Sequence, residues 1–130
     1  MTQNVEKTQT CEERVDEHRK NRIEDLRKLW DLYQKDPEAY DDELGNFNEY
    51  ALAFDYVEPD TFENQKEGYY RYQISCGGPS EEFRFFVNVD KSVHRIEFWF
   101  LDWFDGSNQV LSGKDLELMT EIYNFLACIE

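Results

Sequence analysis

Basic residues are scarce in this chain of 130 residues: 14 Lys and Arg stand against 29 Asp and Glu, and the net charge is −15. A protein that binds nucleic acid needs a patch of Lys and Arg to contact the phosphates. Residues 1–35 hold eight of the bases, but eight acids are interleaved with them. The composition therefore argues against direct binding of nucleic acid.

Cysteine and long apolar runs are also scarce. The three cysteines (Cys11, Cys76 and Cys128) are odd in number, far apart and without CxxC spacing, which is typical of a reducing cytoplasm and not of a disulfide framework. We expect Cys76 and Cys128 to be small buried side chains. Apolar runs such as Phe98–Leu101 are too short to span a membrane, and no secretion signal is recognisable at the N-terminus.

The chain lacks the usual catalytic and metal-binding motifs. His18 and His94 fall in different predicted elements, and no Cys or His stands at metal-ligand spacing. There is no GxSxG motif, and Gly77-Gly78-Pro79 is a chain reversal without the spacing of a phosphate loop. We expect no catalytic residue, no metal and no cofactor, and we interpret the chain as a non-enzyme. A hydrolase or transferase of unrecognised type stays open if a deep pocket joins His94 or Cys76 to other polar groups.

Aromatic residues are abundant, with ten Phe, eight Tyr and three Trp. Because each buries a large area, they predict a real core in spite of the charge. We expect a flexible N-terminus over residues 1–10 and a single α+β domain over residues 11–130. The predicted fold is an antiparallel β-meander of three or four strands, packed against an N-terminal long helix and a C-terminal helix.

Periodicity and turn residues place the elements. Apolar residues at helical spacing predict a helix over residues 11–35, capped by Thr10. Pro37 and Gly45 suggest a short helix over Pro37–Leu44. Tyr50–Val57 is a first strand, or else a helical turn followed by a shorter strand, and residues 58–67 are a loop. The clearest strands are Tyr69–Cys76, Phe83–Val89 with Val89 facing inward, and Val93–Phe104, which we place centrally; a turn at Asp105-Gly106 and a helix after Ser112 follow.

Residues 36–67 are the strongest signal for function, because they contain eleven acids and one base, Lys66. Such a block creates a local field that repels nucleic acid and attracts a cationic surface. Acids on a short helix sit about 5–6 Å apart, which is less dense than DNA phosphates but still presents a row of charge. The alternative is an acidic surface that serves only solubility.

Aromatic side chains threaded through the block favour a protein-binding face, since buried aromatic anchors carry most interface energy. We expect Phe54 and Tyr56 to turn inward. The predicted partner-binding residues are the acids and aromatics Glu38, Tyr40, Asp41, Asp42, Glu43, Phe47, Glu49, Tyr50, Glu58, Asp60, Phe62, Glu63 and Glu67.

A set of short segments runs through residues 44–106: Leu44-Gly45-Asn46, Phe54-Asp55-Tyr56-Val57, Glu67-Gly68-Tyr69-Tyr70-Arg71-Tyr72-Gln73, Gly77-Gly78-Pro79-Ser80-Glu81-Glu82-Phe83-Arg84-Phe85 and Phe100-Leu101-Asp102-Trp103-Phe104-Asp105-Gly106. In these segments the chain resembles a group of small, uncharacterised acidic proteins of plasmids, phages and other mobile elements. The resemblance implies a context, the cytoplasm of a host cell, and no functional residue. Small acidic proteins of such elements are often anti-defence factors, including anti-CRISPR and anti-restriction proteins.

These observations favour a non-enzymatic inhibitor that presents a DNA-mimicking acidic face to a basic, nucleic-acid-binding surface of a nuclease, CRISPR or restriction complex. One alternative is an immunity protein whose acidic face neutralises a nuclease toxin by binding the toxin's basic surface. Another is a homo-oligomeric structural protein, for example a homodimer, that associates through a face containing Trp99 and Trp103.

Overall fold

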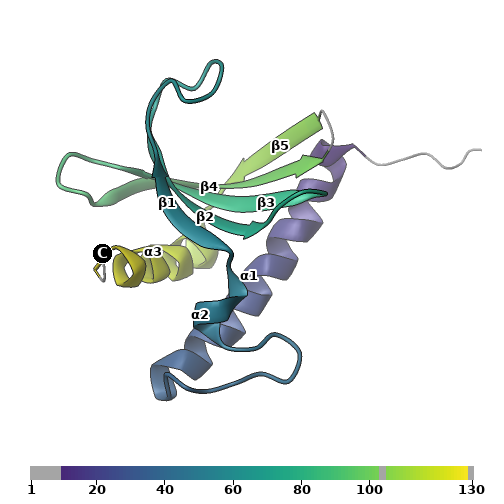
Figure 1. Ribbon diagram of the computed structural model, residues 1–130, viewed down its shortest axis with the longest axis vertical. Helices are drawn as coiled ribbons and strands as arrows, with labels where there is room; N and C mark the ends of the chain where they lie inside the picture. Colours follow the sequence, from purple (N-terminus) through teal and green to yellow (C-terminus); the bar gives the residue numbers. More distant parts are fainter. Residues whose placement is uncertain (1–9, 103–104, 129–130) are drawn as a thin grey trace, which may run out of the picture.

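The computed structural model describes residues 10–102 and 105–128. The chain forms a long helix and a helical turn, then a run of strands, then a second long helix (Figure 1). The elements are α1 (Cys11–Lys35), α2 (Phe47–Tyr50), β1 (Ala53–Val57), β2 (Tyr69–Ser75), β3 (Ser80–Val87), β4 (Val93–Asp102), β5 (Asp105–Val110) and α3 (Gly113–Cys128). The predicted α+β class is confirmed, with five strands in place of the expected three or four. The flexible terminus that we predicted over residues 1–10 lies almost wholly outside the described residues.

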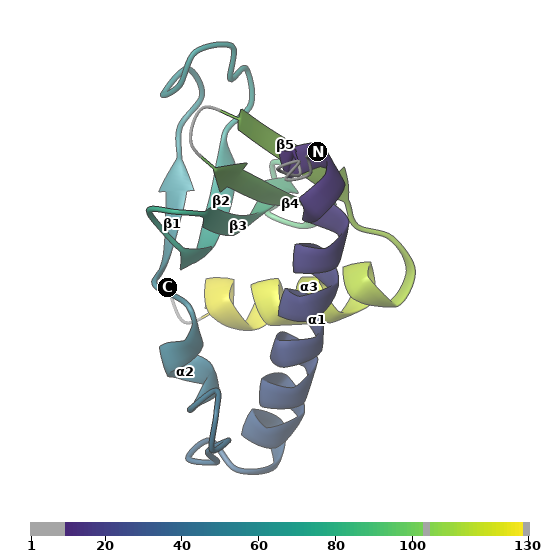
Figure 2. The same cartoon turned by 90° about the vertical axis from the view of Figure 1, so that its right-hand side faces the viewer.

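The five strands form one antiparallel sheet in the order β1-β2-β3-β4-β5, so each strand pairs with its neighbour along the chain. Both α1 and α3 contact β4, and the two helices cross steeply when viewed from the side (Figure 2). The C-terminal half of α1 runs beyond the sheet and carries α2 and the loop between the two helices (Figure 1). Within residues 10–102 and 105–128, the opposite face of the sheet carries no helix (Figure 1).

The core lies between the sheet and the helices. Alternate residues of β3 and β4 point into it, and Phe85, Ile96 and Phe98 are fully buried there. From the helices, Leu26 of α1 and Met119 of α3 are also fully buried in the same cluster. A smaller cluster on the helix-free face consists of Val57, Tyr69 and Phe86.

Helix α1 begins as predicted. The Thr10 hydroxyl accepts a hydrogen bond from Glu13 N, and the Glu13 carboxylate accepts one from Thr10 N, which is a complete capping box. Two ion pairs tie its N-terminal half to the rest of the domain: Arg14 pairs with Asp102 of β4 at 2.8 Å, and Arg19 pairs with Asp115 of α3. The helix is therefore a fixed part of the domain.

The helix predicted over Pro37–Leu44 is wrong, because side chains hold that segment in turns. The Asp41 carboxylate accepts hydrogen bonds from the backbone N–H groups of Glu43 and Leu44, and Asn46 donates to two backbone carbonyls of the same loop. Such local bonds compete with helix formation. A helical turn lies instead at α2, which ends at Tyr50, and β1 begins at Ala53. The alternative of a shorter strand is therefore confirmed, while the turn before it begins earlier than predicted.

The strands also differ from the predictions in detail. Residues after Asp105 form β5 instead of an exit turn, while Trp103 lies outside the described part of the chain. Strand β3 ends at Val87, which leaves Val89 in the following turn and fully exposed; the prediction that Val89 faces inward is wrong. The expected burial of Cys76 and Cys128 is also wrong, since both are exposed, whereas Cys11 is buried.

Candidate functional site

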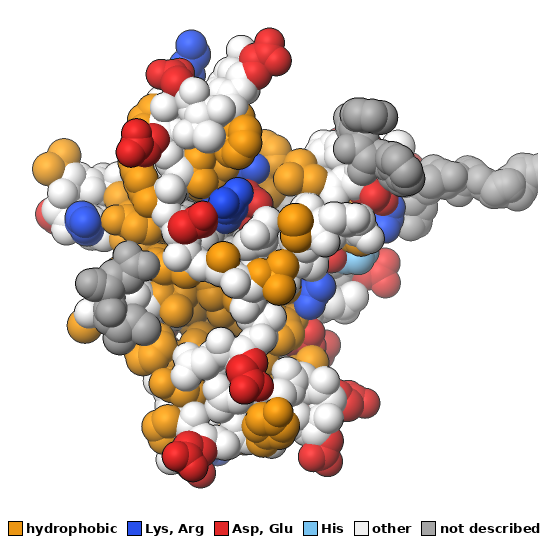
Figure 3. Space-filling view, viewed as in Figure 1, with side chains coloured by type: hydrophobic (Ala, Val, Ile, Leu, Met, Phe, Trp, Pro, Cys, Tyr) orange, Lys and Arg blue, Asp and Glu red, His pale blue; other side chains and the backbone are white. Residues whose placement is uncertain are grey.

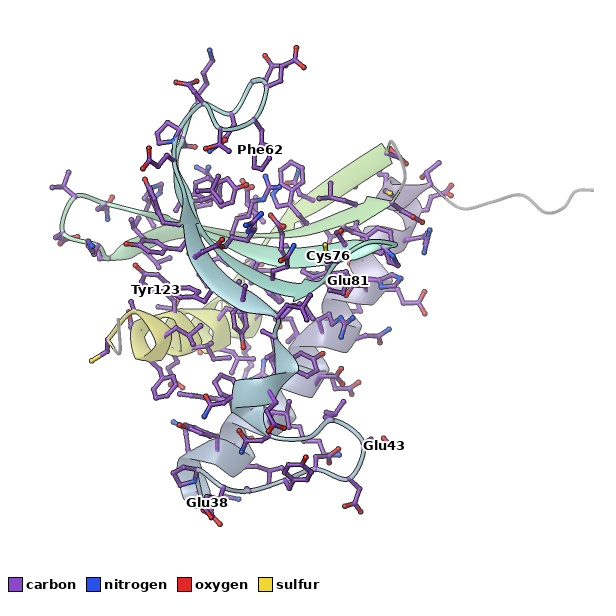
Figure 4. The ribbon with its side chains drawn as sticks, viewed as in Figure 1. Glu38, Glu43, Phe62, Cys76, Glu81 and Tyr123 are labelled. Atoms are coloured by element: carbon purple, nitrogen blue, oxygen red, sulfur yellow. The ribbon has the colours of Figure 1, made fainter. Side chains whose placement is uncertain are left out.

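The acidic block does not form one face. The chain between Phe47 and Val57 runs from one end of the molecule to the other, so nine of the eleven acids lie in two loops at opposite ends (Figures 1 and 4). We call residues 36–46 the α1–α2 loop and residues 58–67 the β1–β2 loop. Glu38 and Glu43 lie at the end opposite Phe62 (Figure 4). On the face seen in Figure 3, acidic side chains stand apart from one another, with hydrophobic and uncharged surface between them.

The α1–α2 loop is the more strongly acidic of the two, with five acids and no base between residues 36 and 46. Among the residues that the structure describes, Asp41 is the one of these five acids that forms an ion pair. Its partner is Lys28 of α1, at 2.8 Å. The hydrogen bond from Lys28, followed by those from the loop backbone, holds the pKa of Asp41 below its ordinary value. Asp41 therefore fixes the loop, while Glu38, Asp42 and Glu43 remain exposed.

The predicted aromatic anchors divide into exposed and buried residues. Tyr40 is 66% exposed on the α1–α2 loop, and Phe62 is half exposed on the β1–β2 loop. The interpretation of Phe47 as an exposed anchor is wrong, because its ring is buried against Trp30, 5.1 Å between centroids. Tyr50 is half-buried, and its hydroxyl donates to Asp25.

The segment between the two loops holds three further residues named in the sequence predictions. Glu49 is exposed at the end of α2, whose first turn it occupies. Phe54 turns inward as predicted and stacks on Tyr70, with 5.6 Å between ring centroids. The prediction that Tyr56 turns inward is wrong, because Tyr56 lies on the edge strand β1 and is 48% exposed.

The β1–β2 loop is built around Gln65. Its side-chain amide donates to the carbonyls of Glu58 and Glu67, and its side-chain oxygen accepts from Phe62 N at 2.9 Å. Glu67 then pairs with Arg95 of β4 at 2.7 Å and ties the loop to the sheet. The remaining predicted acids of this loop, Glu58, Asp60 and Glu63, are exposed.

Beneath this loop, the helix-free face of the sheet is hollowed. Two adjoining hollows of about 350 Å³ and 290 Å³ share the residues Phe62, Tyr69 and Arg84. We call this feature the Arg84 groove. Phe86 and Trp99 line its larger part. Sequence reasoning missed the groove, because its residues come from three strands and a loop and only the strand register brings them together.

Arginines and aromatic rings are layered in the groove. The Arg84 guanidinium lies 3.9 Å from the Trp99 ring centroid and 4.6 Å from that of Tyr69. Arg84 Nε also donates to Glu82 Oε2 at 2.6 Å, and Glu82 is buried. Arg95 stacks on Phe86 at 3.9 Å and donates from Nε to Glu97. Each arginine is thus matched by a carboxylate, so the groove as a whole is close to neutral.

A second polar cluster, also missed, joins α1 to β3. Glu81 is 2% exposed; its carboxylate accepts from Arg22 Nε and lies 2.8 Å from His18 Nδ1. Arg22 donates in turn to the Tyr50 hydroxyl at 2.9 Å. Burial is the main reason that the pKa of Tyr50 is raised, so the phenol stays protonated. This cluster connects structural elements and lines none of the cavities found in the described residues.

Neither Cys76 nor His94 lines a hollow found in the described residues, and the two do not lie together. Cys76 follows the end of β2, whereas His94 stands near the start of β4, which is the opposite end of the antiparallel sheet. Within residues 10–102 and 105–128, no three His, Cys, Asp or Glu side chains converge as a metal site would require. No helix in that part of the chain has the length and apolar character needed to cross a membrane.

Comparison with known proteins adds no relative. The chain matches no protein-family model, no curated protein and no solved structure.

Proposed function

We propose that this protein is a non-enzymatic inhibitor that binds a basic, nucleic-acid-binding surface of a host defence protein, and that the α1–α2 loop makes the first contact. The observation that supports this proposal is the pre-organised acidic surface around Tyr40, in which Glu38, Asp42 and Glu43 are all exposed. The choice of a defence protein as the partner rests on the resemblance of residues 44–106 to proteins of mobile elements.

Fixed geometry favours the α1–α2 loop as a binding surface. Asp41 and Asn46 tie the loop to itself, and Lys28 ties it to α1. A loop that is ordered before binding loses little conformational entropy when a partner arrives. Its exposed carboxylates then steer a cationic surface, and Tyr40 supplies apolar area at the centre of the contact.

The division of the block changes the DNA-mimic interpretation. A single helix with a continuous row of carboxylates is not present, and Glu67 and Asp55 are already paired with Arg95 and Arg71. A partner that docks on one end of the molecule therefore contacts one acidic loop. We assign the primary role to the α1–α2 loop, because no base lies within it.

The test is a tagged-protein capture from a bacterial host that carries CRISPR and restriction systems. The captured complex is then titrated across about 0.05–0.3 M salt, a range over which the Debye length shortens from roughly 14 Å to roughly 6 Å. The variant Glu38→Gln/Asp42→Asn/Glu43→Gln is compared with a matched control in the β1–β2 loop, Glu58→Gln/Asp60→Asn/Glu63→Gln. Both variants remove three negative charges.

We expect the first variant to slow association by about tenfold at low salt and the control to change it much less, because steering depends on where the charge lies. The variant Tyr40→Ala should raise the dissociation rate. Binding that is indifferent to salt and to the first variant would overturn the proposal. Capture of a nuclease toxin in place of a defence complex would identify an immunity protein instead.

A further inference from the structure

The Arg84 groove offers hydrogen-bond donors that the protein leaves unused. Arg84 lines both hollows, and its side chain is only 15% exposed. Its Nε is engaged by Glu82, and neither Nη group has a hydrogen-bond partner among the residues that the structure describes. Because the rings of Tyr69 and Trp99 lie against the guanidinium, its orientation is fixed.

Tyr69 supplies the second unused donor. Its side chain is 1% exposed, and within the described part of the chain its hydroxyl is the one buried side-chain polar atom without a hydrogen-bond partner. Most buried hydroxyls in folded proteins are paired, so an exception of this kind calls for an explanation. Burial raises the pKa of Tyr69, which keeps the hydroxyl protonated and able to donate. Tyr69 lines both hollows, so a ligand in either one lies against this ring.

The surroundings restrict the class of ligand. A ligand needs a hydrogen-bond acceptor opposite the donors of Arg84 and Tyr69. A carboxylate fits, because it can accept two parallel N–H hydrogen bonds from a guanidinium. The rings of Phe62, Phe86 and Trp99 call for an apolar body beside it. A doubly charged phosphate is disfavoured, because the carboxylates of Glu82 and Glu97 already balance the arginines. A volume of about 350 Å³ suits a small molecule.

We propose that the Arg84 groove is a binding site for a small apolar monocarboxylate, whose carboxylate accepts hydrogen bonds from Arg84 Nη and Tyr69 Oη while its apolar part packs between Phe62, Phe86 and Trp99. This site lies beneath the β1–β2 loop, at the opposite end of the molecule from Glu38 and Glu43 (Figure 4). It is independent of the proposed inhibitor function.

The experiment uses 4-phenylbutyrate as the probe and 4-phenylbutyramide and phenyl phosphate as matched controls. Binding is followed by calorimetry and by the nuclear magnetic resonance signal of the Trp99 indole N–H, which donates to Glu97 at 2.9 Å in the groove wall. We expect 4-phenylbutyrate to bind and to move this signal. The amide should bind about tenfold more weakly or not at all, because it cannot form the charge-assisted hydrogen bond that a carboxylate forms with the guanidinium. The phosphate should also bind more weakly, because its second negative charge meets the carboxylates of Glu82 and Glu97.

Three variants assign the contacts. Tyr69→Phe should weaken binding of 4-phenylbutyrate about tenfold without lowering the thermal midpoint, because the hydroxyl that it removes has no partner in the fold. Arg84→Met should abolish binding. Arg27→Met removes an equal charge from α1, where Arg27 lies 3.8 Å from Asp115 of α3 and lines neither hollow of the groove, and should leave binding unchanged. Absence of binding by 4-phenylbutyrate, equal binding of the amide, or unchanged affinity in Tyr69→Phe would each overturn the proposal.

Discussion

Replacement of Glu81 by glutamine tests how α1 is held on the sheet. Glu81 points from β3 toward α1, where it meets Arg22 and His18 (Figure 4). The substitution keeps the shape of the side chain and removes its charge. Arg22 then loses its ionic partner but keeps its bond to the Tyr50 hydroxyl.

The expected magnitude follows from the burial of each partner. Removing one member of a fully buried ion pair costs about 3–5 kcal/mol, and an exposed pair contributes about 0–1 kcal/mol. Glu81 is buried, but the side chains of Arg22 and His18 are 26% and 30% exposed, so water recovers part of their solvation. We therefore expect Glu81→Gln to lower the free energy of unfolding by about 2 kcal/mol.

The assay is urea unfolding at neutral pH, with Glu17→Gln as the control on the exposed face of α1. The control should stay within about 0.5 kcal/mol of the parent protein. A double-mutant cycle with Arg22→Met should give a coupling energy of about 1–2 kcal/mol. A cost for Glu81→Gln below about 0.5 kcal/mol, or a coupling energy near zero, would refute the reasoning.

Three other outcomes are expected. The hydrogen bond from Arg19 helps lower the pKa of Asp16 from 3.8 to about 2, so this carboxylate stabilises the fold above pH 3.8 and loses that contribution as pH falls toward 2. In acid unfolding curves, Asp16→Asn should therefore reduce the loss of stability over this pH window, and an unchanged slope would contradict the assignment. Phe98→Ala, which empties a fully buried position, should cost about 3–5 kcal/mol in urea unfolding, and a loss below about 1 kcal/mol would show that the site is not packed as described. In mass spectrometry of the native protein, a thiol reagent should modify exposed Cys76 and spare Cys11, whose thiol pKa is raised by burial; equal labelling would contradict this assignment.

The long elements were predictable because their signals are long and mutually consistent. Helix α1 combines a capping residue with an apolar stripe sustained over 25 residues. The strands β2, β3 and β4 alternate aromatic or branched residues with polar ones, and turn residues separate them. In each case several independent local preferences point to the same structure.

Strand β5 was missed because its sequence, Asp105–Val110, carries almost none of the residues that favour strands. It is an edge strand that β4 orders by backbone pairing, from Asp102 opposite Asp105 to Glu97 opposite Val110. The loop after α1 was misjudged for the opposite reason. Pro37 and Gly45 gave a helix signal, but the hydrogen bonds of Asp41 and Asn46 stabilise turns instead.

The candidate site also could not be predicted from local sequence signals, because these do not show which distant residues meet in the fold. Sequence proximity suggested one acidic surface, yet the intervening segment places Glu38 and Glu43 at the opposite end of the molecule from Phe62 (Figure 4). Conversely, Tyr69, Arg84 and Trp99 are remote in sequence and meet only because of the register of β2, β3 and β4. Periodicity assigns a residue to a face of a strand, but it does not assign neighbours across strands.

The bonds that hold α1 in place also bear on how the chain is made. Cys11 N donates to Asp105, Arg14 pairs with Asp102, and Arg19 with Asp115, so the sequence separations are 94, 88 and 96 residues. During synthesis, α1 therefore leaves the ribosome long before the strands and the helix that cover it have been made. The apolar stripe of α1 stays exposed to solvent until those later elements are synthesised. Chains that stop before β5 would lack two of the elements that contact α1, β5 and α3, and would leave part of its apolar stripe exposed, which makes premature termination here a route to aggregation or to capture by chaperones.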